Sequence, residues 1–181
     1  MISVVIPAFN EEHTIGLCLK ALVRQNTKRP FEVIVVDNNS TDQTVKAAEK
    51  FKKILNLKII SQKEKGRGPA RQAGFKAASG EIILSTDADA TVYPEWIETL
   101  VSTLEKSDAI AVTGPCRIDD QHWFTNIGLN IVQPSVMRVY RLMYGHYWLT
   151  GSNFGIYKKN YDKAGEFSLG HHAMEDIDLS F

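Results

Sequence analysis

Short apolar runs alternate with segments of helical periodicity along most of this 181-residue chain. The apolar runs are rich in valine and isoleucine, as buried strands are, and they lie at residues 2–6, 31–37, 57–61, 81–87 and 109–114. Amphipathic stretches separate them, the clearest being WIETLVSTLEK. Repeated strand-helix units need right-handed crossovers and produce a mainly parallel sheet covered by helices. We therefore predict an α/β fold with a Rossmann-like sheet.

Polar residues and prolines mark where the predicted helices begin. Asn10 is expected to cap the first helix, and Ser40 with Gln43 has capping-box spacing ahead of a helix that runs to about Ile54. Pro69 is expected in the first turn of the third helix, where its missing N–H leaves no bond unmade. The chain shows no internal repeat.

The charge balance argues against nucleic acid as a partner. Lys and Arg number 21, Asp and Glu also number 21, and the formal net charge is 0, so any anion site must be local. Cys18 and Cys116 lack metal-ligand spacing and are expected to be reduced core residues. Met1 leads directly into a strand, with no basic leader and no long apolar region, which favours a cytoplasmic location.

Polar residues follow three of the predicted strands. They lie at residues 7–11, 37–40 and 87–90. Because ligands of parallel sheets bind at the carboxyl ends of the strands, we expect these segments to meet at one rim. Taken singly, Asn10 has an ordinary interpretation as a helix cap and Asp37 as a turn former. The constellation, rather than any one residue, predicts a functional site.

Asp87 and Asp89 end the strand EIILSTD and its continuation STDADA. Side chains two residues apart in an extended segment emerge on the same face, so these carboxylates crowd each other. Paired carboxylates suit a hard divalent cation such as Mg²⁺ or Mn²⁺ that is shared with a phosphate. We predict a metal site here.

Two common phosphate-binding motifs are missing. The residues after the first strand, PAFNEE, are not glycine-rich as in a dinucleotide-binding fold, and no GxxxxGK[ST] sequence occurs. Glycines and basic residues instead gather after the third strand, at Lys65, Gly66, Arg67, Gly68, Arg71 and Gly74. Such a loop and helix start could approach a diphosphate.

The sequence resembles the family 2 glycosyltransferases, which use nucleotide-activated sugars. The matching pieces are VVIPAFNEEHTI, VIVVDNNSTDQT, GRGPARQAGFKAASGEIILSTDADA, GSNFGIYKKNYDKAGEF and EDIDLSF, in the family's order. The resemblance implies the GT-A fold over residues 1–181 as one domain. Residues from about 1 to 115 would bind the nucleotide sugar, and residues from about 116 to 181 would form the acceptor side.

The resemblance also implies a role for individual residues. Those expected to bind the donor are Pro7, Ala8, Glu11, Asp37, Asn39, Arg67, Arg71, Asp87 and Ala88. Asp87 to Asp89 looks like the family's DxD motif, in which Asp89, together with Asp87, would hold Mn²⁺ or Mg²⁺. Asp176 looks like the catalytic base. The residues expected on the acceptor side are Trp148, Gly151, Ser152, Asn153 and Glu175.

The implied reaction is an inverting transfer of a hexosyl or N-acetylhexosaminyl group. The metal would neutralise the leaving nucleoside diphosphate, and Asp176 would take the proton of the attacking acceptor hydroxyl. A UDP- or GDP-sugar donor and a glycan or lipid-linked acceptor are expected, as in the synthesis of cell-envelope polysaccharides. No QxxRW motif follows Asp176, so the resemblance favours a non-processive enzyme.

The segment from 119 to 149 is apolar and aromatic, but Pro134, Arg138 and Arg141 interrupt it. It is therefore a poor membrane-spanning helix, and a core or dimer helix is favoured. An alternative interpretation is an interfacial helix that contacts a lipid-linked acceptor. This alternative implies peripheral association with the cytoplasmic face of the membrane. A homodimer is also left open.

The end of the chain carries further expectations. His171 and His172 precede the EDIDLSF segment and are compatible with either a metal cluster or an exposed loop. The chain ends at Phe181, within a predicted helix, which indicates a truncated sequence.

Two other functions are compatible with parts of the sequence pattern. A sugar-nucleotide-binding module without turnover stays as the alternative, and acceptor-dependent turnover would separate the two. A sugar nucleotidyltransferase is disfavoured because its GxGxRxxP-like loop is missing after the first strand.

Overall fold

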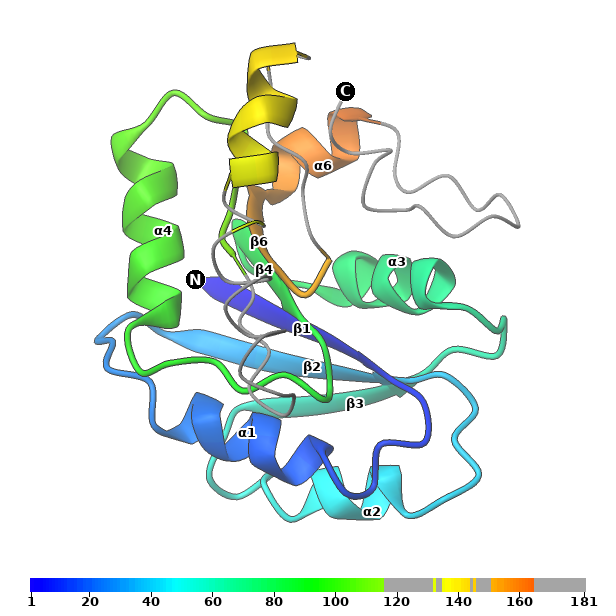
Figure 1. Cartoon of the computed structure of the whole chain (residues 1–181). Helices are drawn as coiled ribbons and strands as arrows, with labels where there is room; N and C mark the ends of the chain where they lie inside the picture. The colour runs from blue at the N-terminus through cyan, green and yellow to red at the C-terminus, as the bar shows by residue number, and fades with distance from the viewer. Residues whose placement is uncertain (116–131, 133–134, 144, 146–150, 165–181) are drawn as a thin grey trace.

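The protein is built on a six-stranded sheet of strand order β3-β2-β1-β4-β6-β5 (Figure 1). A computed structural model describes residues 1–115, 132, 135–143, 145 and 151–164. The strands are β1 (Ile2–Ala8), β2 (Phe31–Asp37), β3 (Leu57–Ser61), β4 (Ile82–Thr86), β5 (Ala111–Thr113) and β6 (Asn153–Tyr157). Strands β1 to β4 run parallel, whereas β6 pairs antiparallel with both β4 and β5. The predicted mainly parallel α/β sheet is confirmed.

Helices cover both faces of the sheet. They are α1 (Ile15–Val23), α2 (Thr44–Glu49), α3 (Arg67–Ala77), α4 (Trp96–Lys106) and α6 (Lys158–Ala164), and residues 135–143 are also helical. Figure 1 shows α1 and α2 on the opposite side of the sheet from α3. No helix within these described ranges is long and apolar enough to cross a bilayer.

Two apolar clusters hold these layers together, one on each face. Alternate residues of β1 separate them, because Val4 and Ile6 join α1, α2 and α4, whereas Val5 joins α3 and α6. All residues of β1 are buried, as expected for a central strand with helices on both faces. Because both faces of the central strands are buried, their sequences are continuous apolar runs. These runs allowed the strands to be predicted from the sequence.

Helix α3 approaches the sheet unusually closely at Gly74. A Cβ atom placed there would lie 2.3 Å from Val5 Cγ1 and 2.9 Å from Val36 Cγ2. Only glycine lets the helix backbone come this near to β1 and β2.

Replacing Gly74 with alanine is expected to lower the free energy of unfolding by about 1–3 kcal/mol, because the methyl group overpacks the interface between α3 and the sheet. Gly16 on α1 is the matched control, since a Cβ there meets nothing within 4 Å. Gly16→Ala is expected to be neutral or slightly stabilising. Urea denaturation of both variants checks this, and equal effects would show that the close approach does not matter.

A buried carboxylate, Glu32, links strands β1, β2 and β3 near their amino ends, whereas the predicted site lies at the carboxyl ends. Glu32 is 1% exposed and accepts hydrogen bonds from Ser3 Oγ at 2.7 Å and from the Ser79 backbone N–H at 2.8 Å. Lys58 Nζ lies 2.8 Å from its other oxygen. Burial acts to raise the pKa of Glu32, but Lys58, Ser79 and Ser3 outweigh it and lower that pKa to about 2.

Acid should therefore weaken the fold through Glu32. Its pKa is lower when folded than its ordinary value of 4.5, so its contribution is complete above that value and disappears as the pH falls towards 2. Glu32→Gln is expected to cost on the order of 2–3 kcal/mol at pH 7 and progressively less below pH 4.5. Urea denaturation between pH 7 and pH 3 measures this difference, and a pH-independent difference would contradict it.

The predicted helix caps are wrong. Helix α1 begins at Ile15, and Asn10 instead adopts a φ of 56° before it, with its Oδ1 accepting a hydrogen bond from the Thr41 backbone N–H at 2.8 Å. Ser40 Oγ accepts from the Asn10 backbone N–H at 3.0 Å rather than joining a capping box with Gln43, which makes no side-chain cap hydrogen bond. The polar groups bond between the two loops, so they are not used within their own helices.

Other boundaries were predicted more successfully. Pro69 lies in the first turn of α3, and the helix at 96–106 is present as predicted. Helix α2 ends at Glu49, earlier than the expected Ile54. Most of the 119–149 segment lies outside the described residues, so its expected packing is not tested.

Candidate active site

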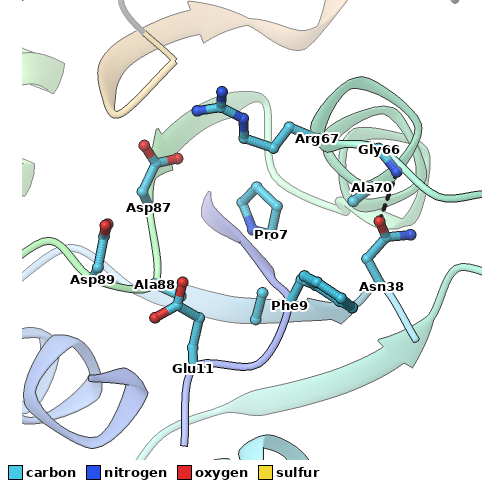
Figure 2. A pocket seen from close by; sticks show the side chains of 11 residues that line it. Pro7, Phe9, Glu11, Asn38, Gly66, Arg67, Ala70, Asp87, Ala88 and Asp89 are labelled. Atoms are coloured by element: carbon cyan, nitrogen blue, oxygen red, sulfur yellow. Dashed lines mark hydrogen bonds between the residues drawn. The ribbon is translucent and has the colours of Figure 1, made fainter. Parts of the chain in front are cut away.

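A cavity of about 290 Å³ opens at the carboxyl ends of β1 and β4, beside the start of α3. Its lining residues come from four separated segments, namely Pro7, Ala8, Phe9 and Glu11 after β1, Asn38 after β2, Gly66, Arg67 and Ala70 at α3, and Asp87, Ala88 and Asp89 after β4 (Figure 2). The three rim segments predicted to meet therefore do so. A parallel sheet whose first strand lies between β2 and β4 creates such a crevice at its switch point.

Most of the predicted donor-binding and metal-binding residues line this cavity, namely Pro7, Ala8, Glu11, Arg67, Asp87, Ala88 and Asp89. Asp37, Asn39 and Arg71 are not among the lining residues. Asp37 Oδ1 accepts a hydrogen bond from the Ser40 backbone N–H at 3.2 Å, and Asn39 Nδ2 donates to the Lys63 carbonyl at 2.7 Å. These two side chains hold the loops that surround the cavity.

Hydrogen bonds between the loops after β1 and β2 hold Glu11 in place. The Glu11 backbone N–H donates to Thr44 Oγ1 at 2.7 Å, and the Thr14 hydroxyl donates to the Glu11 carboxylate. Glu11 is thus held at the cavity wall by Thr14, which directly precedes α1, and by Thr44, the first residue of α2. A preorganised wall lowers the cost of ordering when a ligand binds.

Asn38 connects the end of β2 to the start of α3. Its side chain is buried, with Nδ2 donating to the carbonyls of Gln62 at 2.9 Å and Glu64 at 2.6 Å. Its Oδ1 accepts from the Gly66 backbone N–H at 2.8 Å, the bond that is dashed in Figure 2. Gly66 has a φ of 135°, a conformation that other residues rarely adopt. Asn38 therefore sets where α3 begins.

Charges of opposite sign face each other across the cavity. Figure 2 shows Arg67 extending from the start of α3 towards Asp87, with Asp89 beyond it. The first turn of an α-helix carries unsatisfied N–H groups and a partial positive charge, which favour a bound anion. The combination of a helix start, an exposed guanidinium and two carboxylates suits an anion that arrives with a cation.

Asp87 is tied to a buried arginine. Arg71 is 1% exposed and donates through Nη2 to Asp87 Oδ1 at 3.0 Å and through Nε to Ser85 Oγ at 3.1 Å. Burial raises the pKa of Asp87, although the positive charge of Arg71 opposes this. Asp89 is exposed at the mouth of the cavity.

Cys18 lies beneath the aspartate turn. Its Sγ–H donates to the Asp87 carbonyl at 3.5 Å, and burial, followed by the charges of Asp87 and Asp89, raises its pKa to about 12. The thiol therefore stays neutral, and the prediction that Cys18 is a core residue is confirmed. Cys116 lies outside the described residues.

The carboxylates of Asp87 and Asp89 offer oxygen ligands to a divalent cation. Within the described ranges no group of three or more His, Cys, Asp or Glu residues could hold a metal ion by itself. Mg²⁺ typically takes one or two carboxylates and completes its shell with water and phosphate oxygens. The two aspartates fit a metal that binds together with a diphosphate, because the part of the chain that the structure describes supplies no closed set of protein ligands around them.

The predicted acceptor-side residues are described only in part. Gly151 and Ser152 precede β6, and Asn153 is its first residue. Asn153 Oδ1 accepts from the Trp96 indole N–H at 2.8 Å, and its Nδ2 donates to the Pro115 carbonyl at 3.1 Å. Trp148, His171, His172, Glu175 and Asp176 lie outside the described residues.

Three lining residues were not named individually by the sequence analysis, although two of them lie within the predicted rim segments 7–11 and 37–40. They are Phe9, Asn38 and Ala70. Phe9 is an aromatic residue within the polar PAFNEE segment, which is the signal that the sequence offers, and the structure leaves it half exposed. Asn38 and Ala70 give no such signal, because each is a small buried residue.

Comparison with known proteins decides the family. A model described as "Glycosyl transferase family 2" matches residues 3–173. The chain belongs to this family. Among curated relatives of the family 2 chain, "Glycosyltransferase AglE" of Haloferax volcanii is 37% identical over 116 residues, covering 62% of this chain and 38% of the relative. The poly(ribitol-phosphate) beta-N-acetylglucosaminyltransferase TarS of Staphylococcus aureus is 35% identical over 115 residues, covering 61% of this chain and 20% of TarS.

Solved structures confirm the GT-A fold of the family 2 chain. TarS 1-349 of S. aureus in complex with UDP superposes with a TM-score of 0.78 at 22% identity, over 98% of this chain and 53% of that one. The mannosyltransferase PcManGT of Pyrobaculum calidifontis in complex with GDP-Man and Mn²⁺ gives a TM-score of 0.73 at 22% identity, over 98% of this chain and 50% of that one. The chain spans less than half of the length of AglE and TarS.

Proposed function

We propose that this chain is the donor-binding and catalytic part of an inverting, metal-dependent glycosyltransferase. It would move a hexosyl or N-acetylhexosaminyl group from a nucleoside diphosphate sugar to an acceptor hydroxyl. The observation that carries the proposal is the cavity in which Asp87 and Asp89 face Arg67 and the start of α3. Family membership supports it, as do the structures of related fold that hold UDP, UDP-GlcNAc or GDP-Man with Mn²⁺.

The nucleoside would occupy the end of the cavity near Phe9 and Asn38. Figure 2 shows these two side chains at the end away from the aspartates. The half-exposed Phe9 ring offers a flat apolar surface on which a base can stack. Pro7 and Ala8 form the floor beside it, and Asp37 keeps its predicted role near the nucleoside.

The diphosphate would lie between the start of α3 and the aspartates. Arg67 and the helix N–H groups would bind its oxygens, and Ala70 leaves room because its side chain is small. A divalent metal held by Asp89 and Asp87 would neutralise the charge that develops on the leaving diphosphate. The sugar would then project from this end of the cavity towards the acceptor.

Asp176 would complete the reaction from the acceptor side. As general base it would take the proton of the acceptor hydroxyl while that oxygen attacks the anomeric carbon. The C–O bond to the diphosphate breaks in the same displacement, so the anomeric configuration inverts. Glu175, Trp148 and residues 151–153 keep their predicted places around the acceptor.

The proposed acceptor and cellular setting rest on the family resemblance alone. A glycan or lipid-linked acceptor, non-processive transfer, and a role in cell-envelope polysaccharide synthesis at the cytoplasmic face of the membrane all follow from it. Peripheral membrane association and a homodimer are kept as predictions. A binding module without turnover is the alternative.

Thermal shift measurements test the donor site directly. The full chain is heated with UDP, GDP, dTDP or CDP, each with Mn²⁺, with Mg²⁺ or with EDTA, because a ligand that binds only the folded state raises its stability. We expect one nucleotide to raise the melting temperature in a metal-dependent way, which also identifies the base of the donor. A protein that melts cooperatively but responds to none of these nucleotides would overturn the proposal.

A further inference from the structure

We propose that Arg71 is a positioning residue that acts through Asp87 and does not contact the donor. Ser85 would hold the guanidinium of Arg71, and Arg71 would hold one oxygen of Asp87, so that the other oxygen stays directed to the metal-binding end of the cavity. The proposal rests on the proposed function of the site. It replaces the donor-binding role that the family resemblance implies for this arginine.

Burial argues against direct contact with the donor. The side chain of Arg71 is 2% exposed, whereas Arg67, one helical turn earlier, is exposed and lines the cavity. The two arginines of α3 therefore have different surroundings although both lie near Asp87. A cavity-lining cation can bind a diphosphate, but a buried one must satisfy its charge within the protein.

The close packing of α3 explains why Arg71 is buried there. Gly74 lies three residues later on the same side of the helix, and it allows the backbone to approach Val5 and Val36. The side chain of Arg71 is consequently enclosed between the backbone of α3 and the carboxyl end of β4. The sequence ARQAG thus combines the arginine with the glycine that brings it against the sheet.

The hydrogen bonds define the orientation of Asp87. Ser85 and Asp87 are two residues apart, so both side chains emerge on the α3 side of β4. Arg71 donates to Ser85 Oγ through Nε at 3.1 Å and to Asp87 Oδ1 through Nη2 at 3.0 Å. A planar guanidinium held at two different nitrogens has a fixed plane, and lysine cannot reproduce this geometry.

The second oxygen of Asp87 is then available for a ligand. Among the hydrogen bonds between described residues, the Asp87 carboxylate accepts only through Oδ1. Outer hydrogen-bond partners that orient a ligating carboxylate typically change metal affinity by about 10–100-fold when they are removed. Arg71 and Ser85 have the position of such partners.

Titration of Mn²⁺ by calorimetry, at a fixed concentration of UDP and separately of GDP, tests this role. We expect Arg71→Lys to weaken the apparent Mn²⁺ affinity by about 10–100-fold. Ser85→Ala is expected to weaken it by a smaller factor in the same direction, although Ser85 is fully buried and cannot reach a donor. Nucleotide binding measured in EDTA is expected to change little in either variant, because Arg71 makes no contact with the nucleotide.

Arg67→Met is the matched comparison. Loss of a direct diphosphate contact is expected to weaken nucleotide binding equally with Mn²⁺ and with EDTA, so the ratio of the two affinities stays constant. Circular dichroism and melting temperatures verify that each variant is folded. If Arg71→Lys does not fold, Ser85→Ala serves as the test.

Two results would overturn the proposal. Wild-type Mn²⁺ dependence in folded Ser85→Ala and Arg71→Lys would refute positioning and leave the proposed function intact. Equal loss of binding with Mn²⁺ and with EDTA in Arg71→Lys would instead show direct contact with the donor. If the wild-type chain itself binds neither UDP nor GDP with Mn²⁺, the donor site as a whole is refuted, which is a different outcome.

Discussion

Asp89→Asn is expected to remove the metal-dependent part of nucleotide binding while leaving the melting temperature of the ligand-free protein unchanged. Asp89 is exposed at the cavity mouth, so its charge contributes little to folding. As a direct metal ligand, it should matter at least as much as an outer partner, whose loss costs about 10–100-fold in affinity. Calorimetry with UDP or GDP in Mn²⁺ and in EDTA measures this effect.

Asp87→Asn makes the matched comparison because the two aspartates differ in their surroundings. Asp87 pairs with the buried Arg71, and loss of its charge removes this ion pair from a guanidinium that is shielded from water. We expect the variant to lose metal-dependent binding and also to lose about 1–3 kcal/mol of unfolding free energy. If Asp89→Asn retains wild-type Mn²⁺ dependence, or if both variants are equally destabilised, this division of roles is wrong.

Asp176→Asn is expected to leave donor binding nearly intact and to reduce transfer by about 10²–10⁴-fold, the usual contribution of a general base. The assignment comes from the EDIDLSF segment, which lies outside the described residues. Because the acceptor is unidentified, release of nucleoside diphosphate from a sugar nucleotide with water as the acceptor provides the rate. Binding of UDP or GDP with Mn²⁺ is measured on the same preparations.

Asp162→Asn is the control for this experiment. Asp162 is an exposed carboxylate on α6. It lies beside Lys158 and Glu81, near the amino end of β4, whereas the candidate site is at the carboxyl end of that strand. Its loss is expected to change neither binding nor hydrolysis. A variant of Asp176 that binds the nucleotide much more weakly than the wild type would contradict its role as base, and a hydrolysis rate equal to that of the wild type would do the same.

The local pattern of the sequence predicted the parallel strands well and the loop contacts poorly. Strands such as β1 are buried on both faces, so their apolar runs are continuous and easily recognised. Asn10 and Ser40 have the residue types of helix caps, yet they hydrogen-bond to the neighbouring loop. Strand β6, which inserts antiparallel between β4 and β5, was not predicted, because its pairing joins segments far apart in the chain.

The same distinction applies within the site. Asp87 and Asp89 both line the cavity, as predicted, but the reason differs from the prediction. Strand β4 ends at Thr86, and residues 88–89 form a turn in which the Ala90 backbone N–H donates to the Asp87 carbonyl at 3.1 Å, so the two residues are not part of one extended segment. Arg71 and Arg67 could not be distinguished by sequence, since both are arginines of one basic glycine-rich segment. The described structure buries the first and exposes the second.

By itself, the sequence determined the α/β class, the parallel strands, the rim that carries the polar residues, and the family. These properties depend on local periodicity, on the direction of parallel strands, and on motifs that survive in order along the chain. Only the tertiary structure decided which polar groups face the cavity and which are used within the fold. That choice depends on the close approach of α3 at Gly74 and on hydrogen bonds between separate loops, which bring together residues that no local pattern relates.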